Sequence, residues 1–161
     1  KAGRLPPELG VEVKGRSMQL KFLTLLIVCF ALSVLTVAAP DDSRQIQGSW
    51  VPVTAEMGGQ KMPEQTLRAF KLTLSGDKYT ARNGEITDVG TFKLNPSAKP
   101  KTMDITGTDG PNQGTTFLAI YELTGDSLKI CYDLSGDERP KEFKSNAGTQ
   151  EFLVTYRREK R

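Results

Sequence analysis

Residues Gln45 to Trp50 read QIQGSW and contain the only tryptophan of the chain. Trp50 stands near the start of a run, Ser49 to Met57, that has the composition of a β-strand. Gly48 has no side chain, so the backbone can approach another segment closely where this strand begins. We therefore expect Trp50 to close one end of a sheet, with an arginine of the last strand, Arg157 or Arg158, lying across its ring.

The chain downstream of this motif consists of short alternating runs separated by turn residues, which is typical of an all-β protein. A helical turn is predicted before Gln47, and a short helix after Pro63. Short connections favour antiparallel neighbours, and closure into a barrel removes exposed sheet edges. We predict an antiparallel up-and-down barrel of about eight strands, with a two-sheet sandwich as the main alternative. The expected strands are Ser49 to Met57, Phe70 to Leu74, Lys78 to Arg82, Ile86 to Leu94 with a bulge at Gly90, Thr102 to Thr106, Thr116 to Leu123, Leu128 to Tyr132, Arg139 to Lys144 and Glu151 to Arg158.

The N-terminal quarter of the chain has a different character. Residues 1–17 are rich in proline and glycine and are expected to form no packed element, whereas residues 18–39 have the order of a secretory signal peptide. Lys21 precedes an uncharged run, Phe22 to Val37, and small residues follow it. That run is shorter than the roughly 20 residues that span a bilayer, so an uncleaved membrane anchor is the alternative. We expect residues 40–161 to form a single extracytoplasmic domain, periplasmic or secreted.

The net positive charge of the chain, +3, lies in residues 1–39. Residues 1–39 hold five basic and two acidic residues, so 17 basic and 17 acidic residues remain in 40–161. A neutral domain offers no concentrated positive surface for a phosphate backbone, and nucleic acid is not an expected partner.

The residue types limit the chemistry. The chain contains no histidine, which excludes a Ser-His-Asp or Cys-His centre and disfavours zinc and copper sites. No cofactor or metal is expected. Cys131 is predicted to be a packed thiol, on the strand face opposite Leu128, Ile130 and Tyr132. Glu122 is the one carboxylate within a strongly apolar strand, and either a buried acid-base group or a solvated strand end fits its position.

The two ends of the domain resemble the calycin superfamily, which includes the lipocalins. The opening QGSWVPVTAE supplies Gly48 and Trp50, and the closing VTYRR supplies Arg157 or Arg158 for the arginine that packs on the tryptophan in that superfamily. The resemblance implies a barrel closed at one end. The Arg-x-Tyr pair that holds fatty-acid carboxylates in relatives is replaced by Thr155-Tyr156-Arg157.

A second resemblance extends over most of 46–158. The succession of IQGSWVPVTAEMGGQKMPEQ, LTLSGDKYT, GTFKLNPSAKPKTMDI, FLAIYELTGDSLKICYD and ERPKEFKS is similar to a functionally uncharacterised family of small exported domains of planctomycete bacteria. It implies export and the extent of the domain, and it implies no activity.

These patterns predict a non-enzymatic, lipocalin-like domain that binds a small apolar ligand. The alternative is a structural or protein-interaction module of the cell envelope with a filled core, whose function resides in outer loops such as 107–114. An enzyme, relying on Glu122, is the third reading. The aromatic residues that we expect to line a ligand cavity are Phe70, Phe117, Tyr121, Tyr132 and Tyr156.

Overall fold

A computed structural model describes residues 41–160 of the chain. The predicted upstream segment 1–17 and signal peptide 18–39 lie outside the described residues. The described residues belong to one compact unit.

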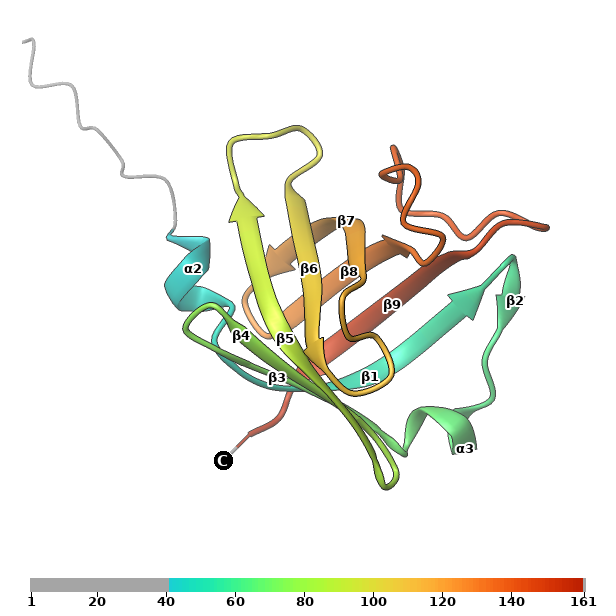
Figure 1. The fold of residues 1–161 in the computed structure, drawn as a ribbon, viewed down its shortest axis with the longest axis horizontal. Coiled ribbons are helices and arrows are strands. Elements are labelled where there is room, and N and C mark those ends of the chain that lie inside the picture. The colour runs from blue at the N-terminus through green and yellow to red at the C-terminus, as the bar shows by residue number, and fades with distance from the viewer. Residues whose placement is uncertain (1–40, 161) are drawn as a thin grey trace, which may run out of the picture. The chain divides into compact units, whose positions relative to one another are not determined.

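The described part is all-β, as the sequence predicts, with two single-turn helices before and after the first strand (Figure 1). Most strand boundaries agree with the predicted ones to within one or two residues, because the alternation ends at the turn residues in each case. The elements are α2 (Asp42–Gln45), β1 (Gly48–Met57), β2 (Gln60–Lys61), α3 (Glu64–Leu67), β3 (Phe70–Ser75), β4 (Lys78–Asn83), β5 (Ile86–Asn95), β6 (Thr102–Asp109), β7 (Thr116–Thr124), β8 (Ser127–Asp133) and β9 (Glu151–Arg158).

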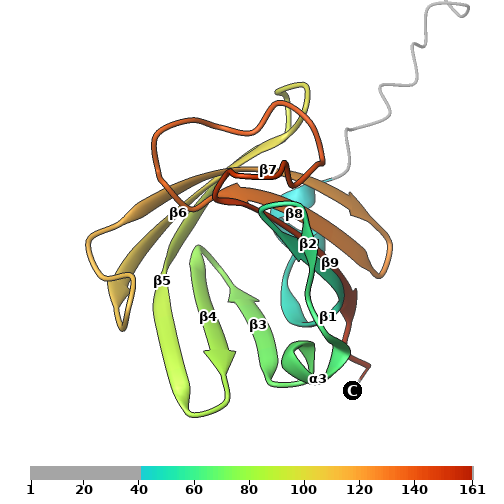
Figure 2. The same ribbon diagram turned by 90° about the vertical axis from the view of Figure 1, so that its right-hand side faces the viewer.

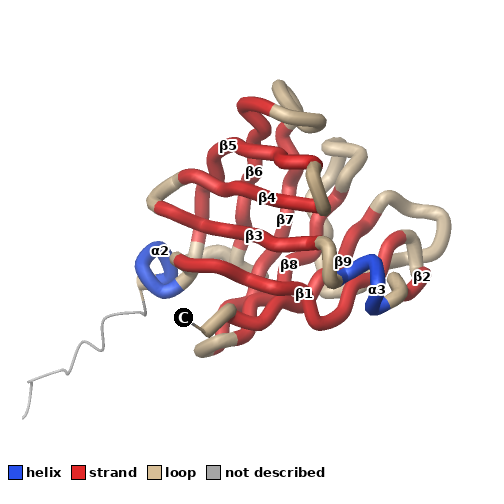
Figure 3. The backbone as a smooth tube through the Cα atoms, turned by 90° about the horizontal axis from the view of Figure 1, so that it is seen from below, coloured by secondary structure: helices blue, strands red, loops and turns tan. Residues whose placement is uncertain are grey.

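Eight of these strands form a closed antiparallel barrel. Each strand from β3 to β8 pairs with the next one along the chain, and β1 pairs with both β3 and β9. The contact between β1 and β9 runs from Trp50 opposite Arg158 to Met57 opposite Phe152. Figure 3 shows β1 between these two neighbours. The barrel prediction is therefore confirmed, and the sandwich alternative is wrong. The short β2 is an additional strand paired to the end of β1.

The two ends of the barrel differ. At one end, α2 lies beside the tight turns after β3 and β7, and at the other end lie β2, α3 and the long loop after β8 (Figures 1 and 2). Trp50 is fully buried at the α2 end, where its indole Nε1 donates a hydrogen bond of 2.8 Å to the carbonyl oxygen of Ile46. Together, α2 and Trp50 close this end of the barrel.

The arginine over the indole is Arg158. Its guanidinium carbon lies 4.1 Å from the centre of the Trp50 ring, and its Nη2 donates to the carbonyl oxygen of Gln45 at 2.6 Å. Its Nε donates to a carboxylate oxygen of Asp126 at 3.0 Å. Gly48 has a φ of +123°, and a β-carbon there would lie 3.1 Å from the Arg158 guanidinium, so the position favours glycine on both counts. Arg157, the other predicted closing residue, is exposed on the outer face.

The predicted strand Arg139 to Lys144 is wrong. These residues belong to the loop between β8 and β9, because those two strands pair directly with each other and no strand lies between them. The loop instead covers the outer face of β7 and β8 (Figure 2). Arg139 donates to the carbonyl oxygen of Ala119 at 2.6 Å, and the thiol of the fully buried Cys131 donates to the carbonyl oxygen of Lys144 at 3.1 Å.

Among residues 41–160, no helix has the length and apolar character needed to cross a membrane.

The two adjacent arginines of β9 provide a test of how the barrel is closed. We expect Arg158→Ala to lower the free energy of unfolding by about 2–4 kcal/mol, because it removes the cation–π contact and leaves backbone carbonyls without their donor. Arg157→Ala should change the free energy of unfolding by less than about 0.5 kcal/mol. Urea denaturation of the three proteins gives both values, and equal losses would contradict the assigned role of Arg158.

Candidate functional site

The barrel contains a cavity of about 340 Å³, within the range of small-molecule pockets. The fully buried part of its wall consists of apolar side chains, including Leu74, Met103 and Ile130. Half-buried aromatic side chains, among them Phe70, Phe117 and Phe152, stand where β3, β7 and β9 begin, at the end opposite Trp50. The cavity is therefore reached from the end of the barrel that α2 does not cover.

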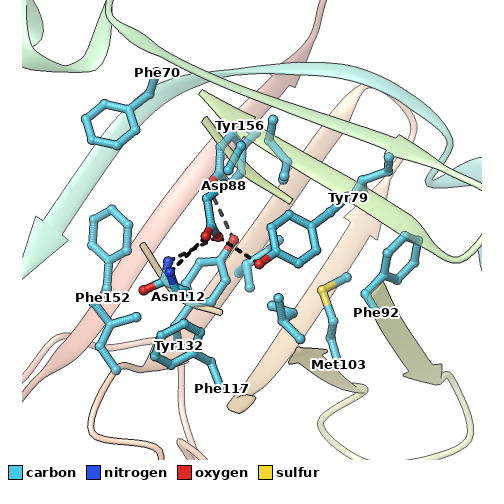
Figure 4. A pocket seen from close by; sticks show the side chains of 16 residues that line it. Phe70, Tyr79, Asp88, Phe92, Met103, Asn112, Phe117, Tyr132, Phe152 and Tyr156 are labelled. Carbon is cyan, nitrogen blue, oxygen red and sulfur yellow. Dashed lines mark hydrogen bonds between the residues drawn. The ribbon is translucent and has the colours of Figure 1, made fainter. Parts of the chain in front are cut away.

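Four of the five predicted lining residues lie on this cavity, namely Phe70, Phe117, Tyr132 and Tyr156 (Figure 4). The sequence analysis did not name the other lining residues as part of a cavity, and these come largely from β3 to β6. They are Leu72, Leu74, Tyr79, Ala81, Asp88, Phe92, Met103, Ile105, Asn112, Ile130, Leu134 and Phe152.

Tyr121 is the exception, and it does not line the cavity. It points into the barrel from β7 but sits near the closed end, where its hydroxyl donates a hydrogen bond of 2.6 Å to Asp42. Lys101 pairs with the same carboxylate oxygen at 2.7 Å. These contacts anchor α2 to the barrel wall, so Tyr121 belongs to the closure at this end.

A polar cluster lies in the wall of the cavity around Asp88. This carboxylate is only 8 % exposed and points inward from β5. Its Oδ2 accepts hydrogen bonds from the hydroxyl of Tyr79 at 2.7 Å and from the side-chain amide of Asn112 at 3.1 Å. Its Oδ1 accepts one from the backbone N–H of Asn112 at 3.0 Å. Three donors thus hold the carboxylate in one orientation.

Two glycines allow this cluster to form. Gly90 lies opposite Tyr79 on the neighbouring strand, and a β-carbon there would lie 2.6 Å from the tyrosine ring, so only glycine leaves room for the ring. Gly107 has the carbonyl of Asn112 folded onto it, where a β-carbon would lie only 2.0 Å from that oxygen. The turn after β6 can therefore bend back over the barrel and deliver Asn112 to Asp88. The pairing of β5 with β6 also shifts its register between Val89 and Gly90, which agrees with the predicted bulge.

Two further tyrosines provide hydroxyl groups to the cavity. The hydroxyls of Tyr132 and Tyr156 lie 3.3 Å apart, and the Tyr132 ring stacks on Phe152 with the ring centres 5.8 Å apart. Burial raises the pKa of Tyr156 to about 12 and the pKa of Tyr132 well above its ordinary value. Both phenols are therefore protonated, neutral hydrogen-bonding groups at physiological pH.

The remaining chemical candidates lie outside the barrel. Glu122 is exposed on the outer face of β7, 4.0 Å from the ammonium of Lys129, so the solvated interpretation of this residue holds. Cys131 is buried beneath the loop after β8, and burial raises the pKa of its thiol to about 11. Neither residue faces the cavity.

One signal in the sequence pointed to Asp88. Phe92, Gly90 and Asp88 are spaced two residues apart on β5, so an inward Phe92 places Asp88 on the same inner face. A carboxylate on the apolar side of an alternating strand is costly without partners, which marks the position as unusual. Asn112 carried no such signal, because its loop contains only turn residues.

No match to this chain was found among models of protein families, curated proteins or solved structures.

The tyrosines predict how stability depends on pH. All four tyrosines of the chain lie within the described residues, and burial raises the pKa of each above 10 in the folded state. The unfolded chain releases these protons near pH 10, whereas the folded chain retains them. The free energy of unfolding should therefore be unaffected by these groups below about pH 9 and fall as the pH rises from 10 toward 12.

Ultraviolet absorbance of the phenolate gives the tyrosine titration, and urea denaturation at each pH gives the stability. The urea-unfolded protein is the control and should titrate near pH 10. Phenolate absorbance that develops at the same pH in the folded protein would contradict the burial of these side chains.

Proposed function

We propose that the protein is a lipocalin-like binding domain that takes one small, largely apolar ligand into the open end of its barrel. The observation that carries this proposal is the cavity of about 340 Å³, bounded by the closed end around Trp50 and lined mainly by apolar and aromatic side chains. Burial of a ligand against such a wall is favourable by roughly 25 cal/mol for each Å² of apolar surface removed from water.

The cavity favours ligand binding over the alternative of a structural module with a filled core. The loop 107–114, on which that alternative relied, folds back so that Asn112 reaches the cavity wall. We interpret this loop as part of the binding site.

The proposed location of the protein is extracytoplasmic, periplasmic or secreted. It rests on the sequence of residues 18–39 and on the resemblance to exported planctomycete domains. The more distant resemblance to calycins agrees with a barrel that opens at one end.

Binding is tested with decanol, an uncharged chain with a small polar head, by isothermal titration calorimetry. Calorimetry is suitable because Trp50 lies at the closed end and does not line the cavity. We expect decanol to bind and to raise the melting temperature, since a ligand that binds only the folded state stabilises it.

Two neighbouring positions on β4 provide the matched variants. Ala81 lines the cavity, and Ala81→Leu should fill part of it and weaken decanol binding at least about tenfold, or about 1.4 kcal/mol. Thr80 alternates with Ala81 and faces outward, so Thr80→Leu should leave binding unchanged. Absence of decanol binding to the unaltered protein, or equal binding to both variants, would refute a ligand site in the barrel.

A further inference from the structure

We infer that the ligand of this cavity is a cation: an apolar body that carries a protonated amine, which pairs with Asp88. The inference rests on the proposed function and specifies the chemical class of the ligand. Within the described part of the chain, Asp88 is the one charged side chain that lines the cavity. The site therefore presents a single negative charge in an otherwise neutral wall.

The hydrogen bonds within the described fold leave one acceptor position of the Asp88 carboxylate unoccupied. A carboxylate offers about four acceptor positions, and Tyr79 and Asn112 together occupy three of them. Two of those bonds go to Oδ2 and only one goes to Oδ1. In the inferred complex, the ammonium group of the ligand donates to the position that remains, on Oδ1.

The other two buried carboxylates among the described residues, Asp42 and Asp133, have all their partners within the fold, and neither lines the cavity. Asp42, at the closed end, pairs with Lys101 at 2.7 Å. Asp133 accepts hydrogen bonds from Ser135 and from the backbone N–H of Glu138 within its own turn, outside the cavity. Asp88 has only neutral donors, and no lysine or arginine among residues 41–160 forms an ion pair with it. Asp88 is thus the one of these three buried carboxylates that both lacks a cation and lines the cavity, so a ligand in the cavity can supply the counter-charge.

The aromatic lining reinforces this selection. The faces of aromatic rings are negative and attract cations, most strongly where water is excluded. Tyr79, which bonds to Asp88, and Tyr132 and Tyr156 line the same cavity (Figure 4). Since the cavity wall contains no cationic side chain, a ligand with a carboxylate head would meet only repulsion from Asp88.

The experiment compares three probes with the same apolar chain and different heads: decylamine, decanol and decanoate. Calorimetric titrations at neutral pH should give the order decylamine, then decanol, then decanoate, with decylamine at least about tenfold tighter than decanol, as expected for a hydrogen bond between charged groups. Asp88→Asn keeps the size of the side chain and removes its charge. It should abolish the preference, so that decylamine and decanol bind the variant with affinities within about twofold of each other.

The matched control is Asp77→Asn, which removes the same charge from an exposed turn at the closed end of the barrel. It should preserve the preference for decylamine, so a general effect of net charge is separated from an effect of Asp88. Melting curves establish that both variants are folded. Tyr79→Phe, which removes one hydrogen bond to Asp88 but keeps the ring, serves as a second probe of the cluster and should reduce the preference without abolishing it.

The outcomes separate this inference from the proposed function. Decanol that binds as tightly as decylamine, or an Asp88→Asn protein that retains the decylamine preference, overturns the cationic ligand and leaves the binding domain in place. If none of the three probes binds, the proposed function fails and the inference fails with it.

Discussion

The pairing of β1 with β9 is the constraint on which the rest of the structure depends. It brings Arg158 onto Trp50 across the seam between the two terminal strands of the barrel. The guanidinium then donates to the carbonyl oxygens of Gln45, the last residue of α2, and of Gln47, just after it, so the helical turn is fixed over the barrel end. With that end closed, the inward space left between the strands is reached only from the opposite end. The contacts that close one end of the barrel thus also determine from which end the cavity opens.

The two ends of the barrel satisfy their charges in different ways. At the closed end, Asp42 has Lys101 and Arg158 has Asp126, so opposite charges neutralise each other within the fold. In the cavity wall, Asp88 is held by Tyr79 and Asn112, which orient it without neutralising it. Because Asp88 also lines the cavity, a ligand there can supply the counter-charge that the fold does not. This contrast connects the fold to the proposed ligand class.

Strands and fold class followed from the sequence because the alternation of apolar residues and the turn residues are local signals. The predicted strand 139–144 was wrong for a global reason, since β8 and β9 pair directly with each other and leave no position between them for another strand. The prediction that Tyr121 lines the cavity was wrong for a similar reason. Tyr121 shares the inner face of β7 with Phe117, but four residues separate the two along the strand, which is about 13 Å. Alternation places both rings inside the barrel, and only the register of the strands decides which end each one faces.

The sequence by itself determined the all-β class and the inward face of most strands, because both depend on residues close together in the chain. It predicted the antiparallel barrel from the short connections, with a sandwich as the alternative, and the closing role of Gly48–Trp50 together with an arginine of the last strand. The tertiary structure alone decided that Arg158 and not Arg157 covers the indole, that a cavity remains, and that Asp88 lines it. Tyr79, Asp88 and Asn112 come from two strands and a loop, and their meeting depends on strand register and on the absence of side chains at Gly90 and Gly107. Such long-range coincidences carry no local signal, because no single segment contains the geometry that produces them.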